Sequence, residues 1–196
     1  MADMKGFERE CESFFRPLWP GEDKILVFGD GNADHPRIML IGEAPGEQET
    51  LKRKPFVGKA GKNLDEFLAL MGMDRGALYV SNVVKIRPTA PGAGGRVRNR
   101  APSKEEIALF LPFLMKEIAL VSPQALVTLG NVPLKALMGT SATIGSLHGK
   151  WHTASNGMKL FALYHPAAII YRRELRSVYE QDVRVLRDSL TIETQK

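Results

Sequence analysis

Cysteine and long apolar runs are the two features that this 196-residue sequence lacks most clearly. A single cysteine, Cys11, excludes a disulfide within the chain and any metal or iron–sulfur site built from cysteines alone. We interpret Cys11 as a small buried apolar residue on a first helix. No apolar run approaches the roughly 20 residues of a membrane helix, and the N-terminus lacks the basic and apolar regions of a secretory signal. We therefore expect a cytoplasmic protein with no membrane partner.

Internal repeats and low-complexity tracts are also missing, and the composition is that of an ordinary globular protein. The length and a hydrophobic content of 44% are sufficient for a buried core. We predict one domain over residues 1–196, in which residues 1–24 form a helical extension packed on the rest.

Apolar runs alternate with stretches of helical spacing along the chain. Strands are predicted over residues 25–28, 38–41, 78–84, 125–129 and 160–164, and helices over residues 7–15, 60–71, 132–138 and 177–190. Ser103 and Glu106 form a capping box that begins a further long helix, in which Pro112 should produce a kink or a break. We interpret residues 87–101, rich in proline, glycine and arginine, as a mobile basic loop. The alternation of strand and helix predicts an α/β fold with a parallel sheet covered by helices on both faces.

The net charge of +5 is modest, but the basic residues are clustered. Each cluster follows a predicted strand, so a parallel sheet would bring all of them to one rim, where they would attract a polyanion such as nucleic acid. The alternative is ordinary solvated loop charge. The clusters are Lys52 to Lys54, Arg96 with Arg98 and Arg100, Lys150, and Arg172 with Arg173 and Arg176.

The stretch from residue 37 to residue 71 is the first candidate for an active site. An apolar run without alternation, residues 38–41, is typical of a buried parallel strand, and Gly42 ends it. Pro45 and Gly46 then favour a turn. Because ligands of open α/β sheets bind at the carboxyl ends of strands, the acidic residues of this turn should lie in a crevice. They are Glu43, Glu47 and Glu49.

Polar residues at the ends of other predicted strands point to the same crevice. Asn82 lies in the second central strand and His165 follows the last one. Either residue alone is more often structural, but together at strand ends they indicate a site. Phe56 is either a core residue or an aromatic platform for a flat base, since stacking is worth about 1–3 kcal/mol per base.

Six motifs, in the order GEAPGEQE, KPFVGKAG, SNVVKIRP, LVTLG, LHGKW and YHPAAII, resemble the uracil-DNA glycosylase superfamily, most closely its family-four branch. The resemblance runs from about Val27 to the end of the last helix. It implies a three-layer α/β/α sandwich around a short, mainly parallel four-stranded sheet. It also implies a monomeric, monofunctional base-excision repair enzyme that removes uracil from single- or double-stranded DNA and leaves an abasic site.

The resemblance implies a role for each matched position. Glu43 and Ala44 would lie beside the reacting sugar, with Glu43, Asn82 and His165 as the catalytic residues. Asn82 would read the uracil edge, because an amide both donates and accepts hydrogen bonds. His165 would donate to uracil O2 as the glycosidic bond breaks. The remaining base-binding residues would be Glu49 and Phe56, and the DNA-binding residues would be Lys150, Ile169, Ile170, Arg172 and Arg173.

Two departures from the family pattern affect these expectations. Family-four members hold an iron–sulfur cluster on four cysteines, but the cysteine of their KCRP motif is Ile86 here, and a later one falls near Phe110. The first two fall near Ser13 and Arg16. We therefore predict no cluster, no cofactor and no metal. The second departure is from other branches of the superfamily, which carry an aspartate that positions water where this sequence has Ala44.

Other functions are compatible with the same motifs. The enzyme could prefer another deaminated base such as hypoxanthine, or it could be a catalytically weak DNA-binding or damage-sensing relative. A third alternative is a small-nucleotide or phosphate-binding α/β protein that cradles phosphate in the GEAPGE loop. Three glutamates in this segment disfavour the third alternative, because they would repel the anion.

Overall fold

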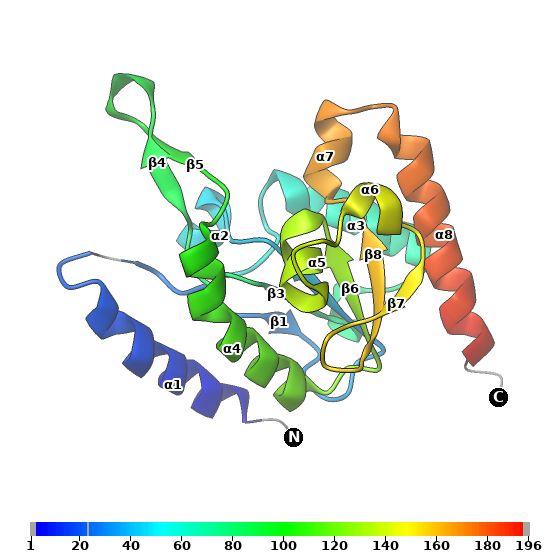
Figure 1. The fold of residues 1–196 in the computed structure, drawn as a ribbon, viewed down its shortest axis with the longest axis horizontal. Helices are drawn as coiled ribbons and strands as arrows, with labels where there is room; N and C mark the ends of the chain where they lie inside the picture. Colours follow the sequence, from blue (N-terminus) through cyan, green and yellow to red (C-terminus); the bar gives the residue numbers. More distant parts are fainter. Residues whose placement is uncertain (1–2, 23, 194–196) are drawn as a thin grey trace.

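A six-stranded sheet in the order β1-β3-β2-β6-β8-β7 runs through the middle of the computed structural model, which describes residues 3–22 and 24–193 (Figure 1). The four inner strands are parallel, and the short strands at the two edges pair antiparallel with their neighbours. The predicted four-stranded parallel sheet is thus confirmed as the centre of a slightly larger sheet. The strands are β1 (Asp30–Gly31), β2 (Ile38–Gly42), β3 (Tyr79–Asn82), β6 (Ala125–Leu129), β7 (Trp151–Thr153) and β8 (Lys159–Leu163).

One predicted strand, residues 25–28, is wrong. This segment belongs to neither sheet, although Val27 donates a backbone hydrogen bond to Lys85 (2.7 Å). Its apolar residues pack instead against the N-terminal helix, where the rings of Phe28 and Phe7 meet edge to face at 6.3 Å. The short apolar run therefore serves packing rather than strand pairing.

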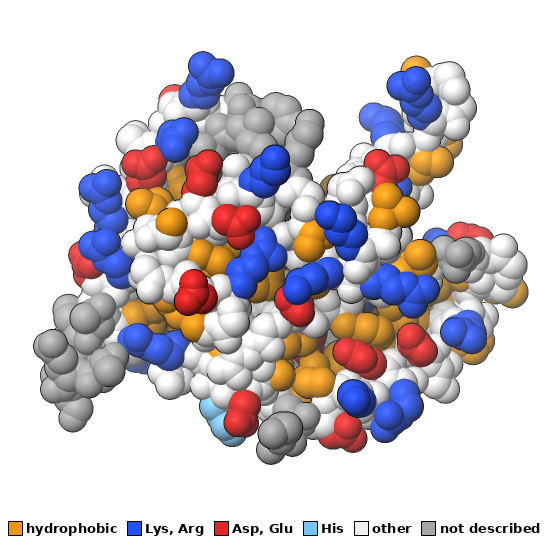
Figure 2. All heavy atoms as spheres, turned by 180° about the vertical axis from the view of Figure 1, so that it is seen from behind, with side chains coloured by type: hydrophobic (Ala, Val, Ile, Leu, Met, Phe, Trp, Pro, Cys, Tyr) orange, Lys and Arg blue, Asp and Glu red, His pale blue; other side chains and the backbone are white. Residues whose placement is uncertain are grey.

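A two-stranded hairpin stands outside the main sheet and corrects the prediction of a mobile loop over residues 87–101. Strands β4 (Thr89–Pro91) and β5 (Val97–Asn99) pair antiparallel. The turn between them includes the short 3₁₀ segment η3 (Ala93–Gly95), in which Gly94 and Gly95 have φ of +66° and +75°. Glycine adopts such angles without steric strain, which permits this turn. Figure 2 shows the hairpin from behind as a projection with Lys or Arg side chains near its end.

Helices cover both faces of the sheet and confirm the three-layer arrangement. One face is covered by α1 (Met4–Phe15), α4 (Lys104–Val121), α5 (Asn131–Met138) and α6 (Ile144–Leu147), and the other by α3 (Lys59–Met71) and α8 (Leu175–Glu193). Two short helices, α2 (Glu47–Lys52) and α7 (Pro166–Tyr171), follow β2 and β8, and the 3₁₀ segments η1 (Arg16–Leu18) and η2 (Arg75–Ala77) lie in connections. No helix among the described residues is long and apolar enough to cross a membrane.

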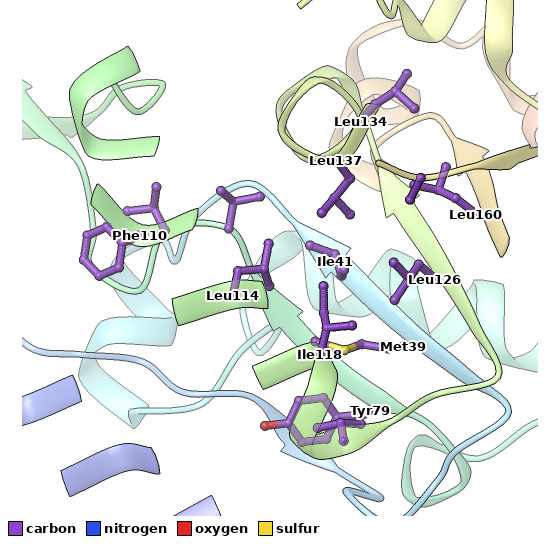
Figure 3. Packing of buried hydrophobic residues seen from close by; sticks show 14 of the residues in the cluster. Met39, Ile41, Tyr79, Phe110, Leu114, Ile118, Leu126, Leu134, Leu137 and Leu160 are labelled. Carbon is purple, nitrogen blue, oxygen red and sulfur yellow. The ribbon is translucent and has the colours of Figure 1, made fainter. Parts of the chain in front are cut away.

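The central strands read as continuous apolar runs because each face of the sheet has its own core. Met39 and Ile41 of β2 pack with α4 and α5, and Ile38 and Leu40 pack with α3 and α8. Figure 3 shows the first of these cores, with Ile118 of α4 near Met39. Burial on both faces removes the polar alternation of a half-exposed strand.

Helix α4 has the predicted capping box but not the predicted break. Ser103 Oγ accepts from the Glu106 amide (3.2 Å), and Glu106 Oε2 accepts from the Ser103 amide (2.7 Å). Pro112 lies inside a helix that continues to Val121. Both Pro112 and Ala108, whose carbonyl loses its helical partner, are exposed, so water can replace the missing hydrogen bond.

Candidate active site

A cavity of about 410 Å³ lies where the carboxyl ends of β2, β3 and β8 meet. It brings together five site residues that were predicted from four separate motifs: Ala44, Glu49, Phe56, Asn82 and His165. Two hollows with larger volumes, about 510 and 760 Å³, lie beside Trp19 and between α3 and α8. Neither is lined by residues of these strand ends, so we take the smaller cavity as the candidate site. Its other described lining residues are Gly46, Glu47, Gln48, Gly58 and Asn99.

Asn82 is the last residue of β3 and is only 3% exposed. Within the described part of the chain, its side chain forms no hydrogen bond, whereas its backbone carbonyl accepts one from Lys85 (2.7 Å). A buried amide normally finds partners for its donor and acceptor groups. The Asn82 amide is therefore available to a ligand that offers both kinds of group.

Gly42 makes room for the two side chains that face it. A Cβ atom at this position would lie 2.4 Å from Asn82 Oδ1 and 2.5 Å from Phe56 Cζ, well inside contact distance. Gly42 is paired in register with Asn82. Glycine at the end of β2 thus permits the amide and the aromatic ring to share the floor of the cavity.

Phe56 is both a core residue and a wall of the cavity. Its ring is 4% exposed and stacks on the ring of His165 with centroids 6.3 Å apart and planes at 27°. Its backbone has φ of +52°, an uncommon conformation for a bulky residue. Arg75 holds this backbone in place by donating to the Phe56 carbonyl (2.6 Å). The strain indicates that the ring position is fixed by its surroundings.

His165 is the N-cap of α7, and its Nδ1 accepts a hydrogen bond from the backbone amide of Ala167 (3.1 Å). Burial lowers the pKa of His165 from 6.5 to about 4, so the ring is neutral near pH 7. Since Nδ1 accepts, the single proton of the neutral ring resides on Nε2. His165 is thus a neutral hydrogen-bond donor at the edge of the cavity.

The acidic residues of the first turn have different surroundings. Glu49 accepts backbone hydrogen bonds from Gly46 (3.1 Å), Val57 (2.9 Å) and Gly58 (2.6 Å), so its carboxylate ties the two ends of this loop together. Glu43 is half-buried, and desolvation raises the pKa of its carboxyl. Glu43 is not among the described residues that line the cavity, although it adjoins Ala44, which is.

A buried ionic cluster that the sequence analysis missed lies behind Asn82. Lys85 Nζ donates to Ser81 Oγ (2.6 Å), the Asn82 carbonyl (2.7 Å) and Glu117 Oε2 (2.6 Å). Tyr79 also donates to Glu117 (3.0 Å), and burial, together with the negative charge of Glu117, raises the pKa of the Tyr79 phenol. A lysine directly after an apolar strand, with a lone glutamate on the inner face of α4, was the available signal in the sequence.

Asn99 is the second residue that the sequence analysis missed. It ends β5 and lines the cavity, and its Oδ1 accepts from Arg87 Nε (2.7 Å). Arg87 also lies 3.4 Å from Glu47 of α2. No pattern within residues 87–101 indicated this placement, because it depends on the pairing of β4 with β5, which brings only the root of the hairpin to the cavity.

The basic clusters are distributed more widely than predicted. Lys52, Arg53 and Lys54 line a hollow with Glu8 and Glu12, so this cluster does not face the cavity. Lys150 is exposed next to His148, which pairs with Asp182 (2.7 Å) and thereby anchors the turn after α6.

Arg172 and Arg173 are exposed directly after α7. The backbone of Ile169 and Ile170 lies in α7, but their side chains are outside the part that the structure describes.

Comparison with known proteins gives a consistent assignment. Residues 28–187 match the family model described as the uracil DNA glycosylase superfamily. The type-4 uracil-DNA glycosylase of Saccharolobus solfataricus is 36% identical over 191 residues, which cover 93% of this chain and 83% of that protein. The type-4 uracil-DNA glycosylase of Archaeoglobus fulgidus is 37% identical over 163 residues, covering 80% and 77%. The crystal structure of Pedobacter heparinus SMUG2 superposes with a TM-score of 0.57 at 13% identity, covering 97% of this chain and 99% of that one, which supports the fold.

Proposed function

Because this chain belongs to the uracil-DNA glycosylase superfamily, we propose that it excises uracil from DNA as a monofunctional enzyme that leaves an abasic site. Family membership makes it an N-glycosyl hydrolase of the uracil-DNA glycosylase class. The proposed substrate is a uracil-containing strand, single or paired, and the proposed working form is a monomer. The roles of the site residues belong to the same proposal.

The observation that carries the proposal is the Asn82 amide, which has no partner among the described residues and lies beside the Phe56 ring and the His165 donor. One edge of uracil presents a carbonyl acceptor next to an N–H donor, and a single amide complements both. The flat ring of Phe56 supplies a stacking surface for the extruded base. A cavity of about 410 Å³ accommodates one pyrimidine and excludes a paired duplex.

His165 acts in the proposed mechanism on the leaving group. The bond between C1′ of the sugar and N1 of uracil breaks, and its electron pair moves into the uracil ring, where O2 becomes negative. A neutral Nε2–H positioned at O2 donates a hydrogen bond that strengthens as this charge develops. Water then adds to C1′, and the proton that it loses passes through solvent to the uracil anion, which gives a C1′ hydroxyl and neutral uracil.

Glu43 stabilises the sugar in this mechanism. Departure of the uracil anion leaves positive charge at C1′, and a half-buried carboxylate beside Ala44 attracts it more strongly than a solvated one would. Glu43 also accepts a hydrogen bond from the attacking water. Ala44 leaves space for this water without holding it, so the water is positioned by Glu43 alone.

The loop amides disfavour the alternative of a phosphate-binding site. Amides of Gly46, Val57 and Gly58 would be the natural anion ligands of this turn, but Glu49 already accepts from all three. An incoming phosphate would have to displace a carboxylate and bear its repulsion. We therefore assign Glu49 a structural role, in which it holds the loop that forms one wall of the base-binding cavity.

DNA contacts are proposed for the region around α7. The turn carrying Ile169 and Ile170 would fill the space left by the flipped base, and Lys150, Arg172 and Arg173 would bind phosphates. Exposed cations at these positions give a binding affinity that falls with salt.

The iron–sulfur cluster implied by the family-four resemblance does not fit the residues of this chain. Such clusters are held by cysteine thiolates, and Cys11 is the single cysteine of the sequence. Phe110, near one expected ligand position, stacks on Phe15 with centroids 4.3 Å apart, and Phe15 in turn contacts Phe113 and Trp19. No group of three or more His, Cys, Asp or Glu side chains among the described residues could hold a metal ion. We propose that aromatic packing replaces the cluster, and iron and sulfide analysis of protein purified without oxygen tests this.

An excision assay tests the proposed function. The protein in excess is incubated with single-stranded and duplex oligonucleotides that contain one uracil or one hypoxanthine, and alkali then cleaves abasic sites. We expect cleavage at uracil, loss of that cleavage in Asn82→Ala, and full cleavage in Asn156→Ala, a matched change at an exposed turn. Absence of cleavage at uracil would refute the proposal, and cleavage at hypoxanthine alone would reassign the base.

A further inference from the structure

The β4–β5 hairpin projects beyond the edge of the sheet that holds the cavity. In Figure 1 the hairpin and α7 rise on opposite sides of this edge, with the strand ends between them. The root of the hairpin reaches the cavity through Asn99, and its tip extends into solvent. The hairpin thus flanks any ligand that enters between it and α7.

Packing of the hydrophobic cores does not explain why the hairpin projects. Residues 93–100 are all exposed, and Val97 is 59% exposed although it is apolar. No residue of the two strands belongs to either buried core. A segment of this kind adds conformational entropy to be lost on folding without burying apolar surface in return. Such an element is more readily explained by a binding role.

The hairpin is fixed at its root and therefore points in a defined direction. Arg100 donates hydrogen bonds from Nη1 and Nη2 to the Glu106 carboxylate (2.6 and 2.7 Å) and from Nε to the Thr89 carbonyl (2.9 Å). On the other strand, Arg87 holds Asn99 and lies near Glu47. These contacts tie the hairpin to α4 on one side and to α2, next to the cavity, on the other.

The charges that remain on the hairpin are all positive. Residues 87–101 contain four arginines and no acidic residue. Arg87 and Arg100 are paired at the root, but Arg96 and Arg98 are exposed and form no ion pair with any residue that the structure describes. Two unpaired arginines on an exposed arm attract a polyanion, and guanidinium groups bind phosphate well.

We propose that the β4–β5 hairpin is a DNA-binding arm in which Arg96 and Arg98 bind backbone phosphates next to the extruded nucleotide, on the side opposite α7. This inference rests on the proposed function, because it takes DNA as the substrate. Asn99 at the root fixes the position of the arm relative to the cavity. The arm and α7 then hold the target strand at two points, which positions the nucleotide between them.

The test measures how DNA binding depends on salt. The probe is a labelled duplex carrying a tetrahydrofuran abasic analogue, which binds but is not cleaved. Removing two phosphate contacts in Arg96→Ala/Arg98→Ala should make the slope of log K against log salt shallower by about 1.4–1.8. KM for uracil-containing DNA should rise while kcat stays constant, since these contacts are made equally in the ground and transition states. Because both residues are exposed, thermal unfolding should match the unchanged protein.

A charge-matched control separates the arm from general electrostatics. Lys5→Ala/Arg9→Ala removes two exposed cations from α1, far from the hairpin in Figure 1, and should leave the slope unchanged. An unchanged slope in the hairpin variant, or an equal change in the control, would refute the proposal that the hairpin binds DNA. If the protein excises no uracil but the slope of log K against log salt becomes shallower in the hairpin variant alone, the proposed function fails and the DNA-binding role of the hairpin is supported.

Discussion

Lys85 Nζ lies 2.6 Å from Glu117 Oε2, and neither side chain is exposed. This ion pair lies directly behind the carboxyl end of β3, since the same Nζ also donates to the Asn82 carbonyl. Ser81 and Tyr79 donate the remaining hydrogen bonds to Glu117. Burial of two charges is tolerated only when they are paired and fully hydrogen-bonded, which is the case here. The pair therefore fixes the backbone that presents Asn82 to the cavity.

Breaking this pair should be strongly destabilising. Lys85→Met leaves the Glu117 carboxylate buried without its cation, and we expect a loss of about 3–5 kcal/mol in the free energy of unfolding. Lys116→Met, on the same helix as Glu117 but in an exposed pair with Glu10, is the control and should change stability by less than about 1 kcal/mol. Urea unfolding measures both. Glu117→Leu alone should also lower the free energy of unfolding. In Lys85→Met/Glu117→Leu the losses of the two single variants should not add, and additive losses would contradict direct pairing.

Gly42→Ala tests whether glycine is needed under the cavity. The new methyl group would overlap both the Phe56 ring and the Asn82 amide, so one of them must move. We expect uracil excision to fall by about 10²-fold, the size of effect that misplacement by 1 Å can produce. Gly145→Ala is the matched control, because a Cβ atom there meets nothing within 4 Å. Equal activity in the two variants would show that the floor of the cavity can adjust.

The central strands and the convergence of Asn82, Phe56 and His165 could be predicted from the sequence, because apolar runs and strand ends are local signals. The roles of Lys85 and Asn99 could not. Lys85 follows an apolar run and reads as the first residue of a loop, and its burial depends on Glu117, 32 positions later. Asn99 reaches the cavity through the pairing of β4 with β5, a contact that proline and glycine content argues against. In both cases, long-range contacts override the local composition.

The titration of His165 should be visible in stability. Burial holds the pKa of His165 at about 4, so between pH 6.5 and 4 the unfolded chain binds a proton that the folded chain does not. The contribution of His165 to stability is therefore fully present above pH 6.5 and is lost as pH falls towards 4. We expect the stability difference between the unchanged protein and His165→Ala to shrink by on the order of 2 kcal/mol across this window. Urea unfolding at several pH values measures it, and a constant difference would contradict a neutral buried ring.

The same residue should affect chemistry at neutral pH. Loss of the Nε2–H donor in His165→Ala should lower kcat for uracil excision by about 10²–10³-fold, the usual effect of removing a donor to a developing oxyanion. His35→Ala changes an exposed histidine and serves as the control. The kcat of the unchanged protein should not respond to His165 between pH 8 and pH 5, because the ring is neutral throughout. A fall in kcat near pH 6.5 that disappears in His165→Ala would mean that the ring acts as a base with an ordinary pKa.

Glu43→Gln should separate activity from stability. Desolvation raises the pKa of Glu43, which means that the ionised carboxylate is less favourable in the folded protein than in the unfolded chain. The penalty is complete above the folded pKa and vanishes below the unfolded value of about 4.3. At pH 7, Glu43→Gln should therefore unfold at a higher temperature than the unchanged protein, and the two should converge as pH falls below 4. Excision should be weaker in the variant, because a neutral amide does not attract the developing sugar cation. Glu12→Gln, at an exposed position on α1, provides the control for removing one negative charge. A variant that is both less active and less stable at pH 7 would show that Glu43 is structural, whereas the stability gain identifies a carboxylate held in an unfavourable place for catalysis.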